Sequence, residues 1–282
     1  MLKHTFCHIH GIGKKIESFL WDSGITCWDD WKDSAALSLP KRVQAEIPAA
    51  LKVSFDALLH NNPFFFADRL ANGEQWRLFS HFRQTTAYID IETTGLHDDA
   101  EITTIALYDG TNIYCYVNGS NLEDFLEDIM RYDVLVSYNG KGFDIPFIEN
   151  FFKVRLPQAH IDLRFVLARL GLKGGLKGCE KKLGINRGAL DGVDGYFAVL
   201  LWRRYQDYCD SKALQTLLAY NIEDTVNLER LMVEAWNRNV EQTPFSDTLS
   251  LPCPQAPEIP FHPDLDCIAA IKRSMIHGKD IF

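Results

Sequence analysis

The sequence predicts an α/β fold, in which a mixed β-sheet is flanked by helices and preceded by a small helical segment. A β-rich run at 86–91 is followed by strand-like runs at 101–108 and 113–117, which the turn Asp109-Gly110-Thr111-Asn112 joins as a hairpin. Strand and helix patterns then alternate up to residue 162, and helical spacing of apolar residues dominates from 163 to 236. A hairpin followed by such alternation is typical of a mixed sheet with helices on its faces.

These patterns divide the chain into a helical N-terminal region (1–84), the region of the predicted sheet (85–238), and a proline-rich extended linker with a C-terminal tail (239–282). The remaining expected elements are helices over 14–21, 40–59, 73–82, 121–130 and 143–152, strands at 134–137 and near 160–162, and an amphipathic segment over 265–275.

Composition excludes several classes of protein. Hydrophobic residues make up 46 % of the chain, enough for a real core, yet none of the apolar runs approaches the ~18 residues of a membrane helix. The first residues lack the apolar stretch and cleavage site of a signal peptide. The seven cysteines are scattered and never form a C-x-x-C pair, which indicates free thiols in a reducing compartment. We therefore expect a cytoplasmic protein without a membrane partner.

The net charge of −9 is unevenly distributed. Within the acidic middle of the chain, residues 153–187 carry nine basic and only two acidic side chains. An acidic protein with one basic tract suggests carboxylates that bind cations and a local groove that binds phosphates. Solvated surface charge explains the tract equally well.

Two carboxylates lie on the first predicted strand. Asp90 and Glu92 are two residues apart, so they point to one face of the sheet while Ile89 and Ile91 point to the other. Adjacent carboxylates repel, and a divalent cation would resolve the repulsion. Taken alone, the pattern more often marks an exposed polar face.

Two further aspartates occupy helices. Asp144 falls in the first turn of a predicted helix, where capping alone would account for it. Asp224 lies in the interior of a long predicted helix, with Tyr220 one turn earlier on the same face. A surface aspartate beside a core tyrosine is the simpler account of that pair.

Together these residues resemble the motifs of the DEDD exonucleases. Tyr88-Ile89-Asp90-Ile91-Glu92-Thr93-Thr94-Gly95 is similar to the first motif, Tyr138-Asn139-x-x-x-Phe143-Asp144 to the second, and Tyr220-Asn221-x-x-Asp224 to the third. Between them, Leu176-Lys177-x-x-Glu180-x-x-Leu183-Gly184 resembles a segment of the exonuclease domains of B-family polymerases. The resemblance covers about 86–238 and is nearest to the bacterial YprB-like ribonuclease H-like proteins.

The resemblance implies a ribonuclease H-like fold and a 3′-5′ exonuclease that releases 5′-mononucleotides from single-stranded 3′ ends. It implies two Mg²⁺ or Mn²⁺ ions held by Asp90, Glu92, Asp144 and Asp224. The position of the histidine sub-class is Ala219, whereas Tyr220 matches the tyrosine sub-class, in which it would position or deprotonate the attacking water. We also expect Thr93, Asn139 and Phe143 to contact nucleic acid.

Two basic regions are candidate phosphate contacts. The sequence from His10 to Lys15 is similar to a helix-hairpin-helix turn, which would make Lys14 and Lys15 phosphate contacts, although little chain precedes it to form a first helix. A simple glycine turn that opens a helix fits equally well. In the basic tract, Lys177, Lys181 and Lys182 could grip a single strand, and we interpret Asp162 just before the tract as structural.

Two other functions remain open at this point. The chain could be a non-catalytic nucleic-acid-binding module on a nuclease fold, or it could recruit a partner through residues 1–84 and the tail. The sequence identifies neither a protein partner nor a preference for DNA or RNA.

Overall fold

The computed structural model describes residues 1–32, 39–97 and 99–276. Its centre is a five-stranded sheet with the order β3-β2-β1-β4-β5. In this sheet β2 is antiparallel to both β1 and β3, whereas β4 is parallel to both β1 and β5. The strands are β1 (Thr86–Thr93), β2 (Ile102–Tyr108), β3 (Ile113–Val117), β4 (Val134–Ser137) and β5 (Ala159–Asp162). The predicted mixed sheet and its hairpin are therefore confirmed.

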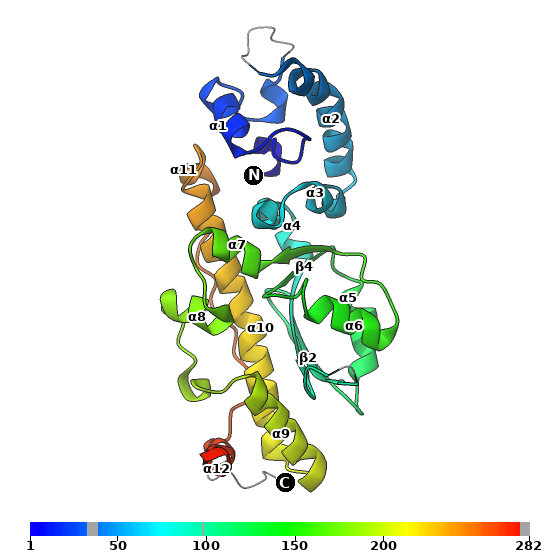
Figure 1. The fold of residues 1–282 in the computed structure, drawn as a ribbon, viewed down its shortest axis with the longest axis vertical. Helices are drawn as coiled ribbons and strands as arrows, with labels where there is room; N and C mark the ends of the chain where they lie inside the picture. The colour runs from blue at the N-terminus through cyan, green and yellow to red at the C-terminus, as the bar shows by residue number, and fades with distance from the viewer. Residues whose placement is uncertain (33–38, 98, 277–282) are drawn as a thin grey trace.

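Helices cover both faces of the sheet (Figure 1). One face packs against α5 (Phe125–Ile129) and α6 (Asp144–Phe152), and Ile89 and Ile91 belong to that apolar core. The other face packs against α10 (Ser211–Val240). The helices near α10 are α7 (Leu163–Arg169), α8 (Gly175–Lys182) and α9 (Gly195–Tyr208). Asp90 and Glu92 thus share one face of β1, as predicted, and the fold places that face under α10.

The longest helix, α10, spans 30 residues, or roughly 45 Å, and begins at the N-cap Asp210, whose carboxylate accepts from the backbone of Lys212. After α10 the chain forms the short helix α11 (Ser246–Leu249), and residues 250–264, without helix or strand, then run back along α10 (Figure 1). Asn237 donates to the carbonyl of Leu251, and the backbone of Asp264 donates to Thr216 near the start of α10. The C-terminal elements are α11 and α12 (Leu265–Ile276).

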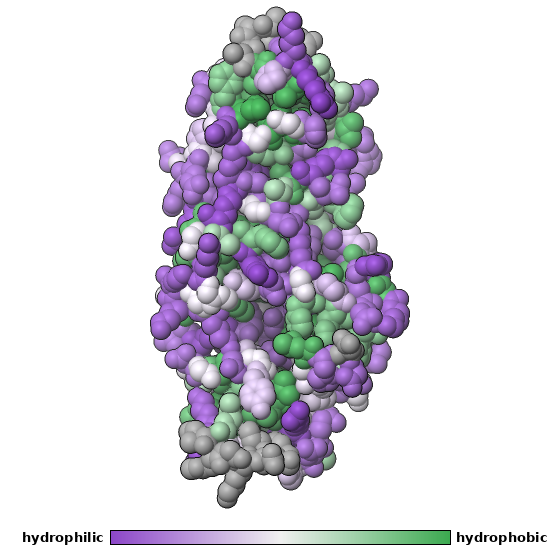
Figure 2. Space-filling model, viewed as in Figure 1, coloured by the Kyte–Doolittle hydropathy of each residue, from purple (hydrophilic) through white to green (hydrophobic). Residues whose placement is uncertain are grey.

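Polar side chains cover most of the face seen in Figure 2, with apolar ones gathered near the top, over the N-terminal part, and in the lower half. Among the described residues, no helix has both the length and the apolar character that crossing a membrane requires.

The N-terminal part consists of helices, most of them short: η1 (Leu2–His4), α1 (Lys14–Asp22), η2 (Trp28–Asp30), α2 (Lys41–Leu59), α3 (Pro63–Arg69), η3 (Asn72–Leu78), α4 (Phe79–Phe82) and η4 (Arg83–Thr85). The single α-helix predicted over 73–82 is wrong, because its first half is the 3₁₀ segment η3. Every residue from Gln75 to Phe79 is buried, so packing on all sides overrides the one-faced periodicity of an amphipathic helix.

A buried ion pair joins two helices of this part, α1 and η3. Glu17 accepts from Arg77 at 2.7 Å and from the backbone of Phe6 at 2.8 Å, and both charged side chains are almost fully buried. Beside this pair, the ring of Trp76 meets that of Trp236 on α10 edge-on, with the centroids 5.4 Å apart. The ion pair thereby ties α1 to η3, and the two tryptophans tie η3 to the end of α10.

Replacing Arg77 with Met should cost about 3–5 kcal/mol of unfolding free energy, because Glu17 would keep a buried charge without its partner. The double variant Glu17→Gln, Arg77→Met should recover much of that loss. Urea unfolding measures both changes. Arg42→Met serves as the control, since its pair with Glu46 is exposed and worth less than about 1 kcal/mol. Equal losses in Arg77→Met and Arg42→Met would contradict the prediction.

Candidate functional site

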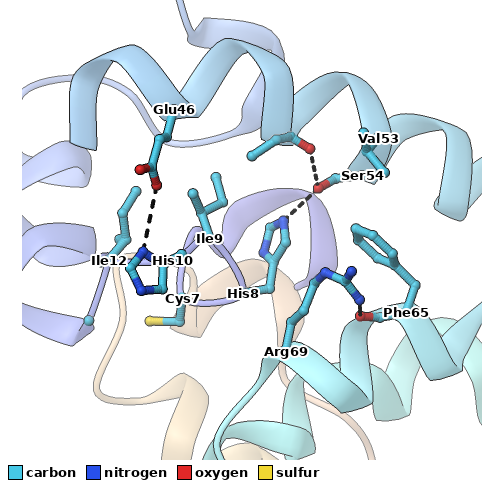
Figure 3. A pocket seen from close by; sticks show the side chains of 13 residues that line it. Cys7, His8, Ile9, His10, Ile12, Glu46, Val53, Ser54, Phe65 and Arg69 are labelled. Atoms are coloured by element: carbon cyan, nitrogen blue, oxygen red, sulfur yellow. Dashed lines mark hydrogen bonds and ion pairs between the residues drawn. The ribbon is translucent and has the colours of Figure 1, made fainter. Parts of the chain in front are cut away.

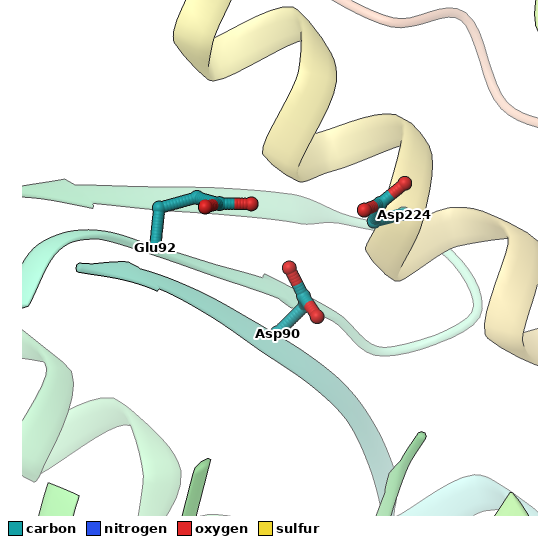
Figure 4. Close-up of side chains that lie close together, drawn as sticks. All are labelled: Asp90, Glu92 and Asp224. Carbon is teal, nitrogen blue, oxygen red and sulfur yellow. The ribbon is translucent and has the colours of Figure 1, made fainter. Parts of the chain in front are cut away.

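Three carboxylates meet between the sheet and α10. Asp90 and Glu92 rise from β1, and Asp224 points toward them from α10 (Figure 4). One oxygen of each lies within 4.8 Å of the others. Glu92 and Asp224 are only 8 % and 5 % exposed, and Asp90 is half-buried. Helix and strand therefore place three negative groups in one small, poorly hydrated space.

This crowding changes the acidity of all three groups. Burial raises the pKa of Asp90 and Glu92 well above the usual range, and the neighbouring carboxylates raise it further. Burial also raises the pKa of Asp224, although Arg187 and Lys177 oppose that effect. A buried cluster of oxygen ligands fits a hard divalent cation such as Mg²⁺ or Mn²⁺, and binding one would relieve both the repulsion and the desolvation.

The position of Asp90 is fixed by Asn221, one turn before Asp224 on α10. The Asn221 amide donates to the Asp90 carboxylate at 2.8 Å and to the Asp90 backbone carbonyl at 3.2 Å. Its own oxygen accepts from Thr104 on β2. Asn221 therefore ties α10 to two strands at the site, a role that its place beside Tyr220 in the third motif could have suggested.

Asp144 lies beside this cluster but is not one of the three groups within 4.8 Å. It is the first residue of α6 and only 4 % exposed, and it accepts a hydrogen bond from the backbone of Ile91 at 3.3 Å. Burial raises the pKa of Asp144 to about 7. Its negative charge is close enough to raise the pKa of both Asp90 and Glu92. The structure thus brings the fourth predicted carboxylate to the edge of the site.

The loop before Asp144 is held by Asp162. The Asp162 carboxylate accepts from the backbone of Asn139 at 2.8 Å and of Lys141 at 3.1 Å, which agrees with the structural interpretation of this residue. Asn139 has a left-handed backbone, with φ at 67°, and its side-chain oxygen is taken up by Arg164. Gly140, between Asn139 and Lys141 in the chain, leaves no room for a side chain, since a Cβ there would lie 2.0 Å from the Ser137 hydroxyl oxygen.

Two members of the basic tract turn inward to the site. Arg187 is 9 % exposed and contacts both Asp224 and Glu180, and Lys177 donates to the Tyr220 hydroxyl at 2.9 Å. The tract is therefore not one continuous cationic surface, because Arg187 is paired with carboxylates and Lys177 with the carbonyl of Val193. Lys181 and Lys182 remain exposed, and Lys182 also donates to the carbonyl of Lys173. Sequence reasoning missed the role of Arg187, which appears only once Glu180 and Asp224 are brought together.

Tyr220 is 3 % exposed and lies under two cations. The Lys177 ammonium is 4.7 Å from its ring centroid, and the Arg187 guanidinium is 5.9 Å away. Burial raises the pKa of Tyr220, and the charge of Asp224 raises it further. The phenol therefore stays protonated and can donate a hydrogen bond.

A cavity of about 450 Å³ opens beside Glu92. Thr93 and Phe143, two of the expected nucleic-acid contacts, line it, together with Tyr196 and Arg203 of α9. Tyr196 is 58 % exposed at the rim. The volume lies in the range of small-ligand pockets, and its aromatic walls suit a flat ring.

A second cavity, of about 650 Å³, lies in the N-terminal part between the glycine turn and α2 (Figure 3). Only the 3₁₀ turn η1 precedes the glycine turn, so the first helix of a helix-hairpin-helix is absent from the described residues. Lys14 and Lys15 are both exposed, and the Lys14 ammonium lies 3.6 Å from a carboxylate oxygen of Glu74. Phosphate binding by these two lysines stays a prediction.

Comparison with known proteins identifies the sheet-containing part. The sequence model of the RNase H superfamily matches residues 87–236. No curated protein matches the chain. Among solved structures, the family B DNA polymerase of the hyperthermophilic archaeon Pyrobaculum calidifontis is similar, at 17 % identity and a TM-score of 0.43. That match covers 59 % of this chain and 27 % of the polymerase chain.

Asp144→Asn should make the unfolding free energy less dependent on pH in the metal-free protein. The folded state holds this proton with a pKa of about 7, whereas an unfolded aspartate releases it near pH 4. Its contribution to stability is therefore complete below about pH 4 and lost as the pH rises through about 7, with a slope of at most ~1.4 kcal/mol per pH unit. Urea unfolding in EDTA at several pH values measures the slope. Glu127→Gln, which alters an exposed carboxylate, should keep the wild-type slope, and an unchanged slope in Asp144→Asn would refute the assignment.

Proposed function

The chain belongs to the RNase H superfamily, and on that basis we propose that it is a metal-dependent 3′-5′ exonuclease acting on single-stranded nucleic acid. It would release 5′-mononucleotides. The observation that carries the proposal is the buried convergence of Asp90, Glu92 and Asp224. Structural roles do not favour such a cluster, because burying three like charges together is costly unless a cation offsets them.

The cation site would use the three carboxylates, with Asp144 at its edge as a fourth ligand. Bound Mg²⁺ or Mn²⁺ ions stabilise charge on the attacking and leaving oxygens of a phosphodiester. The protein's own contribution is to hold the ligands in place: Asn221 fixes Asp90, and the packing of α10 fixes Asp224. The donor set is oxygen only, which favours these ions over zinc.

The cavity beside Glu92 suits the terminal nucleotide of a single strand. Phe143 and Tyr196 could stack on the base, and Arg203 supplies a positive charge at the same cavity. Thr93 also lines this cavity. A pocket of this size takes one nucleotide rather than a continuous duplex, which supports attack at a chain end.

The motifs support the tyrosine sub-class of DEDD exonucleases and a kinship with the YprB-like proteins. Because the pKa of Tyr220 is raised, its phenol would orient the attacking water by donating a hydrogen bond rather than by removing a proton. Lys177 donates a hydrogen bond to the phenolic oxygen and so helps to fix its position.

Asp90→Asn and Asp224→Asn should each leave less than about 1 % of the wild-type nuclease rate, since several kcal/mol of transition-state stabilisation depends on the cation that they hold. End-labelled single-stranded DNA and RNA of one sequence, incubated with Mn²⁺ or with EDTA, measure the activity and the preference. Wild-type protein should shorten the strands stepwise from the 3′ end in Mn²⁺ only. The exposed Glu127→Gln variant should match it. Binding without any Mn²⁺-dependent shortening would instead indicate a non-catalytic binding module.

Tyr220→Phe should lower kcat by about 10²-fold, the low end of what general acid–base groups contribute. It should leave Mn²⁺ affinity near the wild-type value, because none of the candidate metal ligands is lost. Tyr205→Phe on α9 removes a phenol outside the site and serves as the control. Single-turnover hydrolysis and Mn²⁺ calorimetry separate the two quantities, and wild-type kcat in Tyr220→Phe would show that this tyrosine only packs.

A further inference from the structure

Arg187 occupies an unusual position for a residue of a candidate cation site. Its Nη2 contacts Asp224, one of the three clustered carboxylates. The same guanidinium binds Glu180 through two hydrogen bonds, of 2.6 Å from Nε and 2.9 Å from Nη2. All three side chains are at least nine-tenths buried. A cation is thus already paired with one of the groups that would ligate a metal ion.

The anchor of Arg187 is Glu180 rather than Asp224. The Glu180 carboxylate is 1 % exposed, grips the guanidinium with both oxygens, and is itself fixed by the Asn227 amide at 2.9 Å. Glu180 does not belong to the three-carboxylate cluster. If Asp224 turned its oxygen to a metal ion, the guanidinium would keep its place on Glu180 and lose only the Asp224 contact.

Arg187 also has a free donor. Its Nη1 is buried and has no hydrogen-bond partner among the described residues. An unsatisfied charged donor is costly in a buried site, so the free protein leaves a hydrogen-bonding capacity unused. Losing the Asp224 contact would also free one of the two N–H groups of Nη2, while the other stays on Glu180. The two nitrogens together form the planar fork that matches two oxygens of a phosphate.

We propose that Arg187 is a phosphate-binding residue of this site, and that in the free protein Asp224 occupies the position of a substrate phosphate. When a divalent cation takes Asp224 as a ligand, the guanidinium remains on Glu180 and binds the phosphate that is to be cleaved. Cation and phosphate therefore enter the site cooperatively, each favouring the other through the exchange of one ion pair. This inference rests on the proposed function of the site.

The test compares Arg187→Gln with wild type in two binding measurements. Calorimetry with Mn²⁺ alone should show an affinity that rises several-fold in the variant, because a competing cation leaves Asp224. Calorimetry with a 5′-mononucleotide, adenosine or deoxyadenosine monophosphate, should show an affinity about tenfold lower than wild type when Mn²⁺ is present. In EDTA the mononucleotide affinity should not change, since Arg187 is then still paired with Asp224.

Two companion variants keep the result interpretable. Glu180→Gln with Arg187→Gln removes both buried charges and retains side chains of similar shape, so it should fold even where the single variant does not, and it should show the same opposite shifts. Arg131→Gln removes an exposed arginine and should change neither affinity.

The opposite signs distinguish phosphate binding from a structural role. A loss of both affinities in a folded variant would mean that Arg187 only supports the site, and no change in either would mean that it has no part in binding. Either result would overturn the inference and leave the nuclease proposal standing. Absence of Mn²⁺ binding by the wild-type protein would instead refute the proposed function itself.

Discussion

Like charges confined to one buried space repel, and the sheet-containing part of this protein is arranged around that repulsion. One oxygen of each of Asp90, Glu92 and Asp224 lies within 4.8 Å of the others. Asp224 therefore raises the pKa of both Asp90 and Glu92, and Glu92 raises that of Asp90. The surrounding contacts offset the effect only in part: Asn221 donates to one carboxylate and Arg187 pairs with another. The remaining repulsion is what the proposed divalent cation would neutralise.

The helix α10 supplies one of the three carboxylates and the amide that positions another. Along α10, Asn221 and Asp224 face β1, while Trp236 near the end of the helix packs against Trp76 of the N-terminal part. The extended C-terminal segment returns along the same helix and is hydrogen-bonded to it at both ends. Contacts at both ends of α10, together with its packing on the sheet, oppose a shift of the helix and so help to fix the position of Asp224 relative to β1.

Local pattern was enough to predict the strands of the sheet, the hairpin and the shared face of Asp90 and Glu92, because period-two alternation depends only on neighbouring residues. Pairing between distant residues was not predictable in the same way. From the sequence, Arg187 belonged to a basic tract, and its contacts with Glu180 and Asp224 are visible only in the fold. From Gln75 onward the 3₁₀ segment η3 is likewise buried on all sides, and the pattern of apolar residues within one segment does not reveal such burial.

The topology of the sheet explains why the first motif, on β1, and the second, which follows β4, lie next to each other. Strands β1 and β4 run parallel, so their carboxyl ends lie at one edge of the sheet, where the loops of α/β proteins commonly build binding sites. Their pairing stops at Tyr88, which leaves the Ile91 N–H without a strand partner on that side, and Asp144 accepts its hydrogen bond instead. The second motif is therefore docked on the first by a backbone bond that the short β4 leaves free. That hydrogen bond places Asp144 next to the three clustered carboxylates rather than among them, along the edge of β1 that β4 does not cover.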